Sequence, residues 1–418
     1  MSEATIGQKR FPALANRDFR ILWYGMLFAS GTMAFQYYAQ MWLIYSITDS
    51  SWTLGLLGAI RGIATLLFGL YGGALADRMD RRLLLILTET IALIVSLVLG
   101  VMVILGYQSL WLIFTLIFIG AATASIDAPI RQALIPELVP QQQIPNAVAL
   151  TTAAQMGSFA VTPILAGFVI DAIGPGGAYV VSTLGNVGIV VVLLMLNYRG
   201  VVRVAASEPV VTSIKYGVTY VRTQSRIMWI IVLMFFASAF GFALFHGPIA
   251  RWAGDILGLA PGQYGLLAAT WGVGTLIASY CLSAVSGVRH LGKILVTGAL
   301  LFGASFLMFG LVRSIPLAAI AYFINGAAWT CASISATSLV QREVSNEVRG
   351  RVMSLFMISG AIAQMNSLLL GFAADLVGMS VMLPSAGLLC TLAVLLLLMF
   401  VPALRNLDLP LVKKNGYE

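Results

Sequence analysis

The chain has 418 residues, of which 60% are hydrophobic and only 10% are charged. A typical soluble domain is about 25% charged, so this composition excludes a soluble globular protein and indicates a polytopic protein of the lipid bilayer. The net charge of +8 does not indicate nucleic-acid binding, because the basic residues lie in short loops between apolar segments and form no basic domain.

The sequence contains no pattern typical of a cofactor-dependent protein or an enzyme. Cys281, Cys331 and Cys390 are isolated within apolar stretches, which predicts neither a metal site nor a disulfide framework. No phosphate-binding loop is present, so ATP is not expected to drive the protein directly. No pair of catalytic carboxylates or nucleophile with its base emerges. We therefore expect no enzymatic activity and no cofactor.

Apolar segments long enough to cross a membrane recur along the whole chain. A transmembrane helix needs ~20 mostly apolar residues. Twelve segments meet this requirement, six on each side of a polar central stretch, which predicts an all-α integral membrane protein. The expected spans are residues 19–45, 54–76, 83–105, 110–134, 146–173, 177–197, 226–250, 262–285, 292–312, 315–340, 350–377 and 380–402.

Lysines and arginines gather on one side of these spans. Of the 24 basic residues, all except Arg61, Arg251 and Arg313 lie on alternate loops or at their edges. Short cytoplasmic loops carry such an excess of cations. We therefore expect a cytoplasmic (inner or plasma) membrane location, with both termini and the central stretch in the cytoplasm.

The two halves of the chain share a short repeat. Residues 166–174 match residues 370–378, with Gly, Phe, Asp and Gly in register. Parallel repeats about an axis along the membrane normal are a known transporter architecture. We expect two pseudo-symmetric six-helix bundles, 1–197 and 226–418. They are joined by a cytoplasmic linker, 198–225, that forms either an amphipathic surface helix or a solvated connection.

The loop between the second and third spans carries five charges in six residues. Gly73, Leu75, Ala76, Asp77, Arg78, Arg81 and Arg82 match Gly-x-Leu-Ala-Asp-Arg-x-Gly-Arg-Arg/Lys, the helix 2–3 signature of the major facilitator superfamily. With the twelve helices and the repeat, the chain resembles that superfamily over essentially its whole length. Asp80 stands where the family has Gly, which leaves the local backbone open, although Asp also tolerates turns.

Two more stretches resemble the drug- and siderophore-exporting branch of that superfamily, of the transmembrane secretion effector type. They are residues 127–140, followed by Asn146 and Ala147, and residues 347–354. The fifth span keeps Pro163 and Gly167 of the antiporter pattern Gly-x-x-x-Gly-Pro-x-x-Gly-Gly. Three of its glycines are replaced by small residues, which preserve close helix packing.

The resemblance implies a conformational latch on the cytoplasmic side. Asp127 near the end of the fourth span would pair with Arg81, and Asp77 would face the N-terminal end of the eleventh span. The alternative is a purely structural pair between Asp127 and Arg131, one turn apart. The latch residues are Gly73, Asp77, Arg78, Arg81, Asp127 and Arg131.

Arg61 lies inside the second span, where a charge costs ~2.5–3.5 kcal/mol and needs a partner. Since family folds pack helix 2 against helix 11, we expect an Arg61–Asp375 bridge that closes the extracellular side. Asp171, which repeats Asp375, joins this outer gate or caps a helix. Two alternatives for Arg61 stay open, namely contact with an anionic group in the cavity and snorkelling to the interface.

Glu89 and Asp127 are the candidate proton carriers. Glu89 lies about two turns inside the third span, where burial favours the neutral form of a carboxyl group. The alternative is a structural acid held by neighbouring hydroxyl groups or by a cytoplasmic arginine.

The family fold lines its central cavity with helices 1, 4, 7 and 10. In this chain those helices bring aromatic rings and a few amides, which suit an amphiphilic organic solute better than a sugar. The alternative is that half of the aromatic rings face lipid. The candidates are Gln36, Tyr37, Gln40, Phe240, Asn325, Trp329 and Gln364.

These features together predict a monomeric secondary transporter that works by alternating access. We expect proton-linked efflux of a drug-like or siderophore-like amphiphile, as in multidrug antiporters, with the proton gradient as energy source. Two alternatives are a lysophospholipid translocator of the same fold and a non-transporting membrane receptor or sensor.

Overall fold

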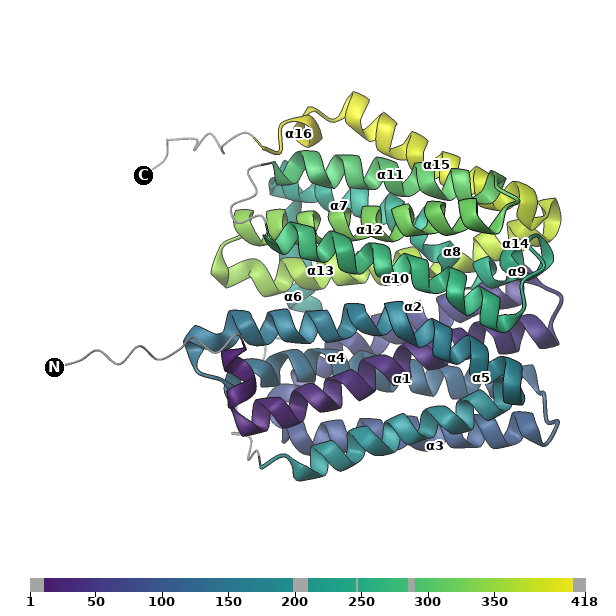
Figure 1. The fold of residues 1–418 in the computed structure, drawn as a ribbon. Helices are drawn as coiled ribbons and strands as arrows, with labels where there is room; N and C mark the ends of the chain where they lie inside the picture. Colours follow the sequence, from purple (N-terminus) through teal and green to yellow (C-terminus); the bar gives the residue numbers. More distant parts are fainter. Residues whose placement is uncertain (1–10, 198–209, 246, 285–289, 409–418) are drawn as a thin grey trace, which may run out of the picture.

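The computed structural model of the protein describes residues 11–197, 210–245, 247–284 and 290–408. Long helices run alongside one another in two groups, α1–α5 and α7–α16 (Figure 1). We call the end at which α1 begins and α15 ends the terminal face, and the other end the opposite face. The first group consists of α1 (Arg17–Ile47), α2 (Ser51–Arg78), α3 (Arg81–Ile104), α4 (Leu110–Leu138) and α5 (Ile144–Met195), with short 3₁₀ turns at Pro12–Ala15 and Gln141–Gln143.

Helix α5 holds two membrane spans. Its backbone breaks at Gly174, whose φ of 73° lies in the left-handed region that only glycine adopts easily. Pro175 then begins the next span, where its fixed φ suits a first helical turn. Residues 144–195 therefore cross twice, as the sequence predicts.

The second group follows the helix of residues 210–223 and contains two interrupted spans. The seventh span of the chain joins α7 (Ser225–Ala237), a π-helical turn at Ser238–Phe242 and α8 (Ala243–Phe245). The eleventh span of the chain joins α13 (Asn346–Met365) and α14 (Ser367–Val377). The remaining helices are α9 (Pro248–Asp255), α10 (Pro261–Ala284), α11 (Leu291–Leu311), α12 (Ile315–Glu343), α15 (Met379–Phe400) and α16 (Pro402–Arg405).

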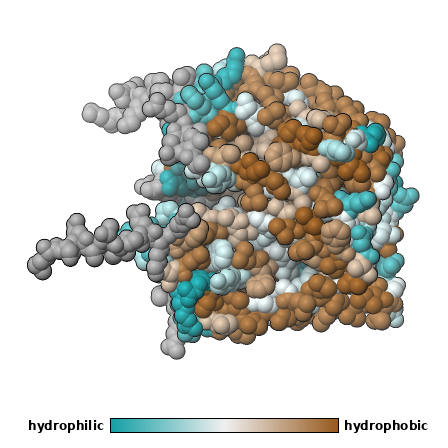
Figure 2. All heavy atoms as spheres, viewed as in Figure 1, coloured by the Kyte–Doolittle hydropathy of each residue, from teal (hydrophilic) through white to brown (hydrophobic). Residues whose placement is uncertain are grey.

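Ten helical segments in the described residues are long and apolar enough to cross a membrane. One of them is the double span of α5, and α1 runs beside them as a further span that is richer in polar residues. The prediction of twelve transmembrane helices in two bundles is thus confirmed. A broad apolar belt covers the visible side of the molecule, and hydrophilic residues gather toward its two ends (Figure 2).

Asp80 explains the departure from the helix 2–3 signature. Its carboxylate accepts hydrogen bonds from the backbone N–H groups of Arg82, at 2.8 Å, and Leu83, at 3.2 Å. These groups have no partner within α3 because they lie in its first turn. Asp80 is therefore the N-cap of α3, a role in which aspartate is favoured and for which the left-handed freedom of glycine is not needed.

The central stretch contains the helix α6 (Val210–Thr223). The guanidinium carbon of Arg351 lies over the ring of its Tyr216, 4.5 Å from the ring centroid. Gly217 approaches Leu355 on the same helix, α13. Residues 210–223 are thus helical, as in the first of the two alternatives, and this helix packs against the C-terminal bundle.

Candidate functional site

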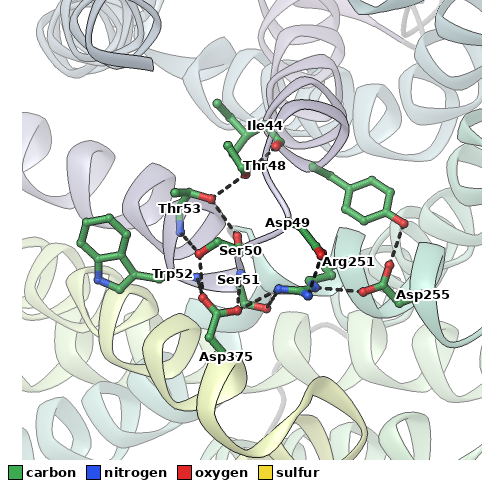
Figure 3. Close-up of polar contacts among 11 residues, drawn as sticks. Ile44, Thr48, Asp49, Ser50, Ser51, Trp52, Thr53, Arg251, Asp255 and Asp375 are labelled. Atoms are coloured by element: carbon green, nitrogen blue, oxygen red, sulfur yellow. Dashed lines mark hydrogen bonds and ion pairs between the residues drawn. The ribbon is translucent and has the colours of Figure 1, made fainter. Parts of the chain in front are cut away.

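Arg251 lies at the centre of a polar network on the opposite face (Figure 3). Its guanidinium bonds three carboxylates, those of Asp49 at 2.9 Å, Asp255 at 2.9 Å and Asp375 at 2.8 Å. Partial burial disfavours the charged form, but the bond to Asp255 and the three negative charges outweigh it and raise the pKa of Arg251. The guanidinium therefore links α9 to α14 and to the loop after α1, across the two bundles.

Asp375 also caps the first turn of α2. It accepts hydrogen bonds from the backbone N–H groups of Ser51, at 2.6 Å, and Trp52, at 3.0 Å, and from the Ser50 hydroxyl, at 2.6 Å. The expected bridge from Arg61 to Asp375 is not formed. The structure gives that role to Arg251, because Arg61 lies deeper in α2.

Asp171 makes the corresponding contact in the other half. Its carboxylate accepts a hydrogen bond of 2.9 Å from the backbone N–H of Gly262, in the first turn of α10. Beside it, a Cβ atom on Gly167 would overlap the Pro261 carbonyl, just as one on Gly371 would overlap that of Ser51. The repeated glycine and aspartate therefore make two equivalent contacts between the bundles. In each contact, one bundle packs against the first turn of a helix in the other bundle.

Further cross-bundle contacts lie beneath this network. The Tyr37 hydroxyl donates to the Phe245 carbonyl at 2.9 Å, and the Ser367 hydroxyl donates to the Gly55 carbonyl at 2.6 Å. The Tyr264 hydroxyl lies 3.6 Å from the Met41 sulfur. The protein is therefore closed at the opposite face in this conformation.

A cavity of about 180 Å³ lies within the N-terminal bundle. All of its lining residues belong to α1–α5. They run from Arg131 and Met26 toward the terminal face to Gln40 and Tyr179 toward the opposite face. The cavity is therefore a chamber lined by one bundle alone, with polar and charged side chains set among apolar ones.

Two carboxylates and one guanidinium meet at the end of this chamber nearer the terminal face. Arg131 bonds Asp127 through Nε, at 2.7 Å, and Glu89 through Nη2. The Thr88 hydroxyl donates to the other oxygen of Asp127 at 2.7 Å. The three charged residues are each less than a tenth exposed, and the Arg131 Nη1 atom has no partner. We call Glu89, Asp127 and Arg131 the buried triad.

The expected latch pair between Arg81 and Asp127 is not formed. Arg81 instead bonds Glu137, at 2.8 Å, and the Ala133 carbonyl, at 3.1 Å. Asp127 is held by Arg131, one turn along α4, as in the alternative interpretation. Of the other latch residues, Gly73 and the side chains of Asp77 and Arg78 have surroundings that the structure does not describe.

Polar groups continue from the buried triad along the chamber. Gln36 donates to the hydroxyls of Ser96, at 2.7 Å, and Ser182, at 3.2 Å, and Asn186 donates to Ser96 at 3.3 Å. Beyond them, Arg61 bonds Gln40. Gln36 and Gln40 thus both line this chamber.

The other cavity candidates lie outside the lining of this chamber. Tyr37 takes part in the cross-bundle contact. Asn325 is buried in the C-terminal bundle, where it bonds Trp271, at 3.2 Å, and Ser305, at 2.9 Å. Trp329 stacks on Phe242 with ring centroids 4.4 Å apart, Phe240 stacks on Phe236 at 6.1 Å, and Gln364 lies on α13.

Comparison with protein families decides what kind of protein carries this chamber. Residues 9–415 match the family described as transmembrane secretion effector, within the major facilitator superfamily. The chain belongs to that family. It is therefore a multi-pass membrane transporter, as the sequence resemblance implies.

Three curated relatives of this transporter come from bacteria. It is 26% identical over 304 residues to the transporter YvqJ of Bacillus subtilis, covering 71% of each chain. It is 21% identical over 353 residues to the staphyloferrin A transporter of Staphylococcus aureus, covering 81% of this chain and 84% of the relative. The macrolide efflux protein A of Streptococcus pyogenes is 21% identical over 342 residues, with the same coverage.

The transporter also shares its fold with solved structures. A POT family transporter in complex with a thioalcohol-conjugated peptide superimposes with a TM-score of 0.78 at 14% identity, covering 93% of this chain and 96% of that one. At this identity the likeness concerns the fold alone.

Several residues of the transporter's site were not predicted from the sequence. The sequence indicates a loop cation at Arg251, and the i,i+4 spacing to Asp255 is the signal for its ion pair. Tyr179, Ser96 and Asn186 gave no signal, because single polar residues in apolar spans are common.

Proposed function

We propose that this transporter exports a small amphiphilic organic molecule in exchange for protons. The relatives that transport staphyloferrin A and expel macrolides support an organic substrate. The observation that supports proton coupling is the buried triad, which lines the chamber and places two carboxylates against one guanidinium.

Charge counting explains why the buried triad would take up a proton. With both acids ionised, the cluster carries one net negative charge within the membrane, where uncompensated charge is costly. One proton makes it neutral. Glu89 is the better site for that proton, since Asp127 already accepts bonds from both Thr88 and Arg131. The cluster lines the chamber. Binding of the proton and binding of the substrate can therefore bias the same conformational equilibrium, which couples the two.

The closed junction at the opposite face supports alternating access between two halves, residues 1–197 and 226–418. In this scheme the Arg251 network and the two aspartate caps break when the bundles rock. The bias of lysine and arginine toward the terminal face supports a bacterial cytoplasmic membrane location, with that face in the cytoplasm. We propose that one chain suffices, because each half docks on the other within the monomer.

The test is proton movement in proteoliposomes with an imposed pH gradient. Ethidium, erythromycin and dansyl-phenylalanine are added in turn, and a pH-sensitive dye reports protons. The wild type should move at least one probe against its gradient and dissipate the pH gradient as it does so.

Two variants separate proton coupling from transport. Glu89→Gln should still equilibrate the probe down its gradient but should no longer respond to the pH gradient. Glu137→Gln, which removes an acid outside the chamber, should behave like the wild type. Probe movement that ignores the pH gradient in the wild type would remove the proton from this scheme. No movement of any probe would reject the exporter function for these classes.

A further inference from the structure

Arg61 is a cation within the membrane that pairs with no acid among the residues that the structure describes. It lies ten residues after the start of α2, or about 15 Å along the helix. Its contacts in the described part of the molecule are a hydrogen bond to Gln40 and the face of the Tyr37 ring, 4.6 Å from the guanidinium carbon. An arginine has five N–H donors, so most of them point at no protein acceptor.

The free donors of Arg61 face the chamber. Arg61 and Gln40 both line it, and the third lining residue at this end is Tyr179. Tyr179 is 2% exposed, and its O–H donor finds no acceptor among the described residues, although the Gln40 amide lies close to the oxygen. A buried donor without an acceptor is costly, and this one lies within electrostatic range of the Arg61 guanidinium. Hydrogen-bond donors without an acceptor, the Arg61 guanidinium on α2 and the Tyr179 hydroxyl on α5, therefore lie at the same end of the chamber.

The acids of the chamber do not satisfy these donors. Glu89 and Asp127 are both held by Arg131, nearer the terminal face. Glu89 lies eight residues into α3 from that face, about 12 Å along the helix. The chamber is therefore electrically two-ended, with the buried triad at one end and an uncompensated guanidinium at the other.

We propose that Arg61 and Tyr179 form a subsite for an anionic group of the substrate, of which a carboxylate is the simplest case. The carboxylate would accept hydrogen bonds from the guanidinium and from the Tyr179 hydroxyl, and would displace the Gln40 oxygen. The apolar remainder of the molecule would lie against Met33, Leu99 and Leu116, which line the same chamber. The inference rests on the proposed function, because it specifies the charge of the exported amphiphile.

A pair of probes that differ only in charge tests this subsite. Dansyl-phenylalanine carries a carboxylate, and its amide is neutral but otherwise closely similar. Binding of each to the full chain in lipid nanodiscs is followed by dansyl fluorescence. The wild type should bind the carboxylate more tightly than the amide.

Variants of the subsite should change that preference selectively. Arg61→Gln should weaken binding of the carboxylate by about tenfold or more, since bonds to charged groups are strong, and should change the amide less than about twofold. Arg61→Lys should retain part of the preference, and Tyr179→Phe should lose a smaller part. Arg313→Gln is the control and should match the wild type, because the bonds of Arg313 among the described residues go to backbone carbonyls outside the chamber.

Three outcomes would overturn the proposal. They are a wild type that does not bind the carboxylate, an equal loss of both probes in Arg61→Gln, and an Arg61→Lys variant no better than Arg61→Gln. Thermal melting checks that each variant is folded. Selective binding without flux in proteoliposomes would keep the anion subsite and reject the exporter function, so the two failures are distinguishable.

Discussion

Asp171 and Asp375 occupy equivalent positions in the two halves, and each accepts hydrogen bonds from the first turn of a helix in the opposite bundle. Asp171 caps α10 at Gly262, and Asp375 caps α2 at Ser51 and Trp52. A carboxylate at a helix N-terminus satisfies free N–H groups and the positive end of the helix dipole. The repeated motif is thus a pair of cross-bundle clamps that close the opposite face.

Replacing Asp375 with Asn should open the opposite face. The change keeps the side-chain shape, but it removes the charge that bonds Arg251 and caps α2. Spin labels on Tyr107→Cys and Ile315→Cys, in a background without the native cysteines, report the distance across that face by electron paramagnetic resonance. We expect a longer distance to gain population.

The matched control for this change is Asp408→Asn. Asp408 also caps a helix, since it accepts from the backbone N–H of Gly292 at 2.7 Å, but it does so within the C-terminal bundle. The distance across the opposite face should then stay as in the wild type. An unchanged distance in Asp375→Asn would show that this carboxylate does not hold the junction closed.

Gly371→Ala should have a similar effect by a steric route. The new methyl group would overlap the Ser51 carbonyl, which is backbone and cannot rotate away. Gly360 has open space around its Cα, so Gly360→Ala should leave closure intact and stabilise the helix by up to about 1 kcal/mol. Spin-label distances and melting temperatures measure both effects. A closed junction in Gly371→Ala would contradict the close packing.

Arg251 should make closure sensitive to acid only through its carboxylate partners. The pKa of Arg251 is raised above its ordinary value, so its stabilising contribution is lost only above that alkaline range. Acid instead acts on the carboxylate side, because protonating Asp375 would remove its ion pair with Arg251. An aspartate carboxyl ordinarily titrates at about pH 3.9, and the bond from Arg251 favours the charged form of Asp375. The label distance in the wild type should therefore stay short as the pH falls to about 4 and lengthen only below it.

Arg251→Gln supplies the comparison for this titration. It should already be open at neutral pH and respond less to acid. A variant that stays closed and titrates like the wild type would show that the ion pairs do not control the junction.

Arg131→Gln should destabilise the protein strongly. It leaves Glu89 and Asp127 facing each other in the membrane without a cation, and breaking such buried pairs costs about 3–5 kcal/mol. Adding Glu89→Gln should recover part of this loss, because it removes one of the two charges. Thermal unfolding of the single and double variants measures the coupling. Additive losses would mean that the groups do not interact.

The sequence was sufficient for the helices and the repeat but not for the partners of the charged residues. Hydropathy and length predicted the spans, and the Gly and Asp positions of the repeat predicted where the halves correspond. Arg251 meets Asp375 and Asp49, which are 124 and 202 residues away in the chain. Such partners depend on how the bundles are docked, which local patterns do not encode.

The position of the cavity also could not be predicted from the sequence. Sequence reasoning predicted lining from both halves, whereas the chamber described here lies within the N-terminal bundle. In the C-terminal bundle, the Trp329 candidate instead stacks on Phe242. Side-chain direction decides whether a ring lines a cavity or fills it, and periodicity does not determine that direction in helices that are apolar on all sides.

In the proposed mechanism the buried triad takes up one proton at Glu89. Infrared difference spectroscopy of the protein in nanodiscs, recorded as a pH titration, tests it without any substrate. We predict a carbonyl stretch from a protonated carboxylic acid that disappears as the pH rises, is absent in Glu89→Gln and is retained in Glu137→Gln. A wild-type spectrum without this band, or a band that survives in Glu89→Gln, would contradict the account.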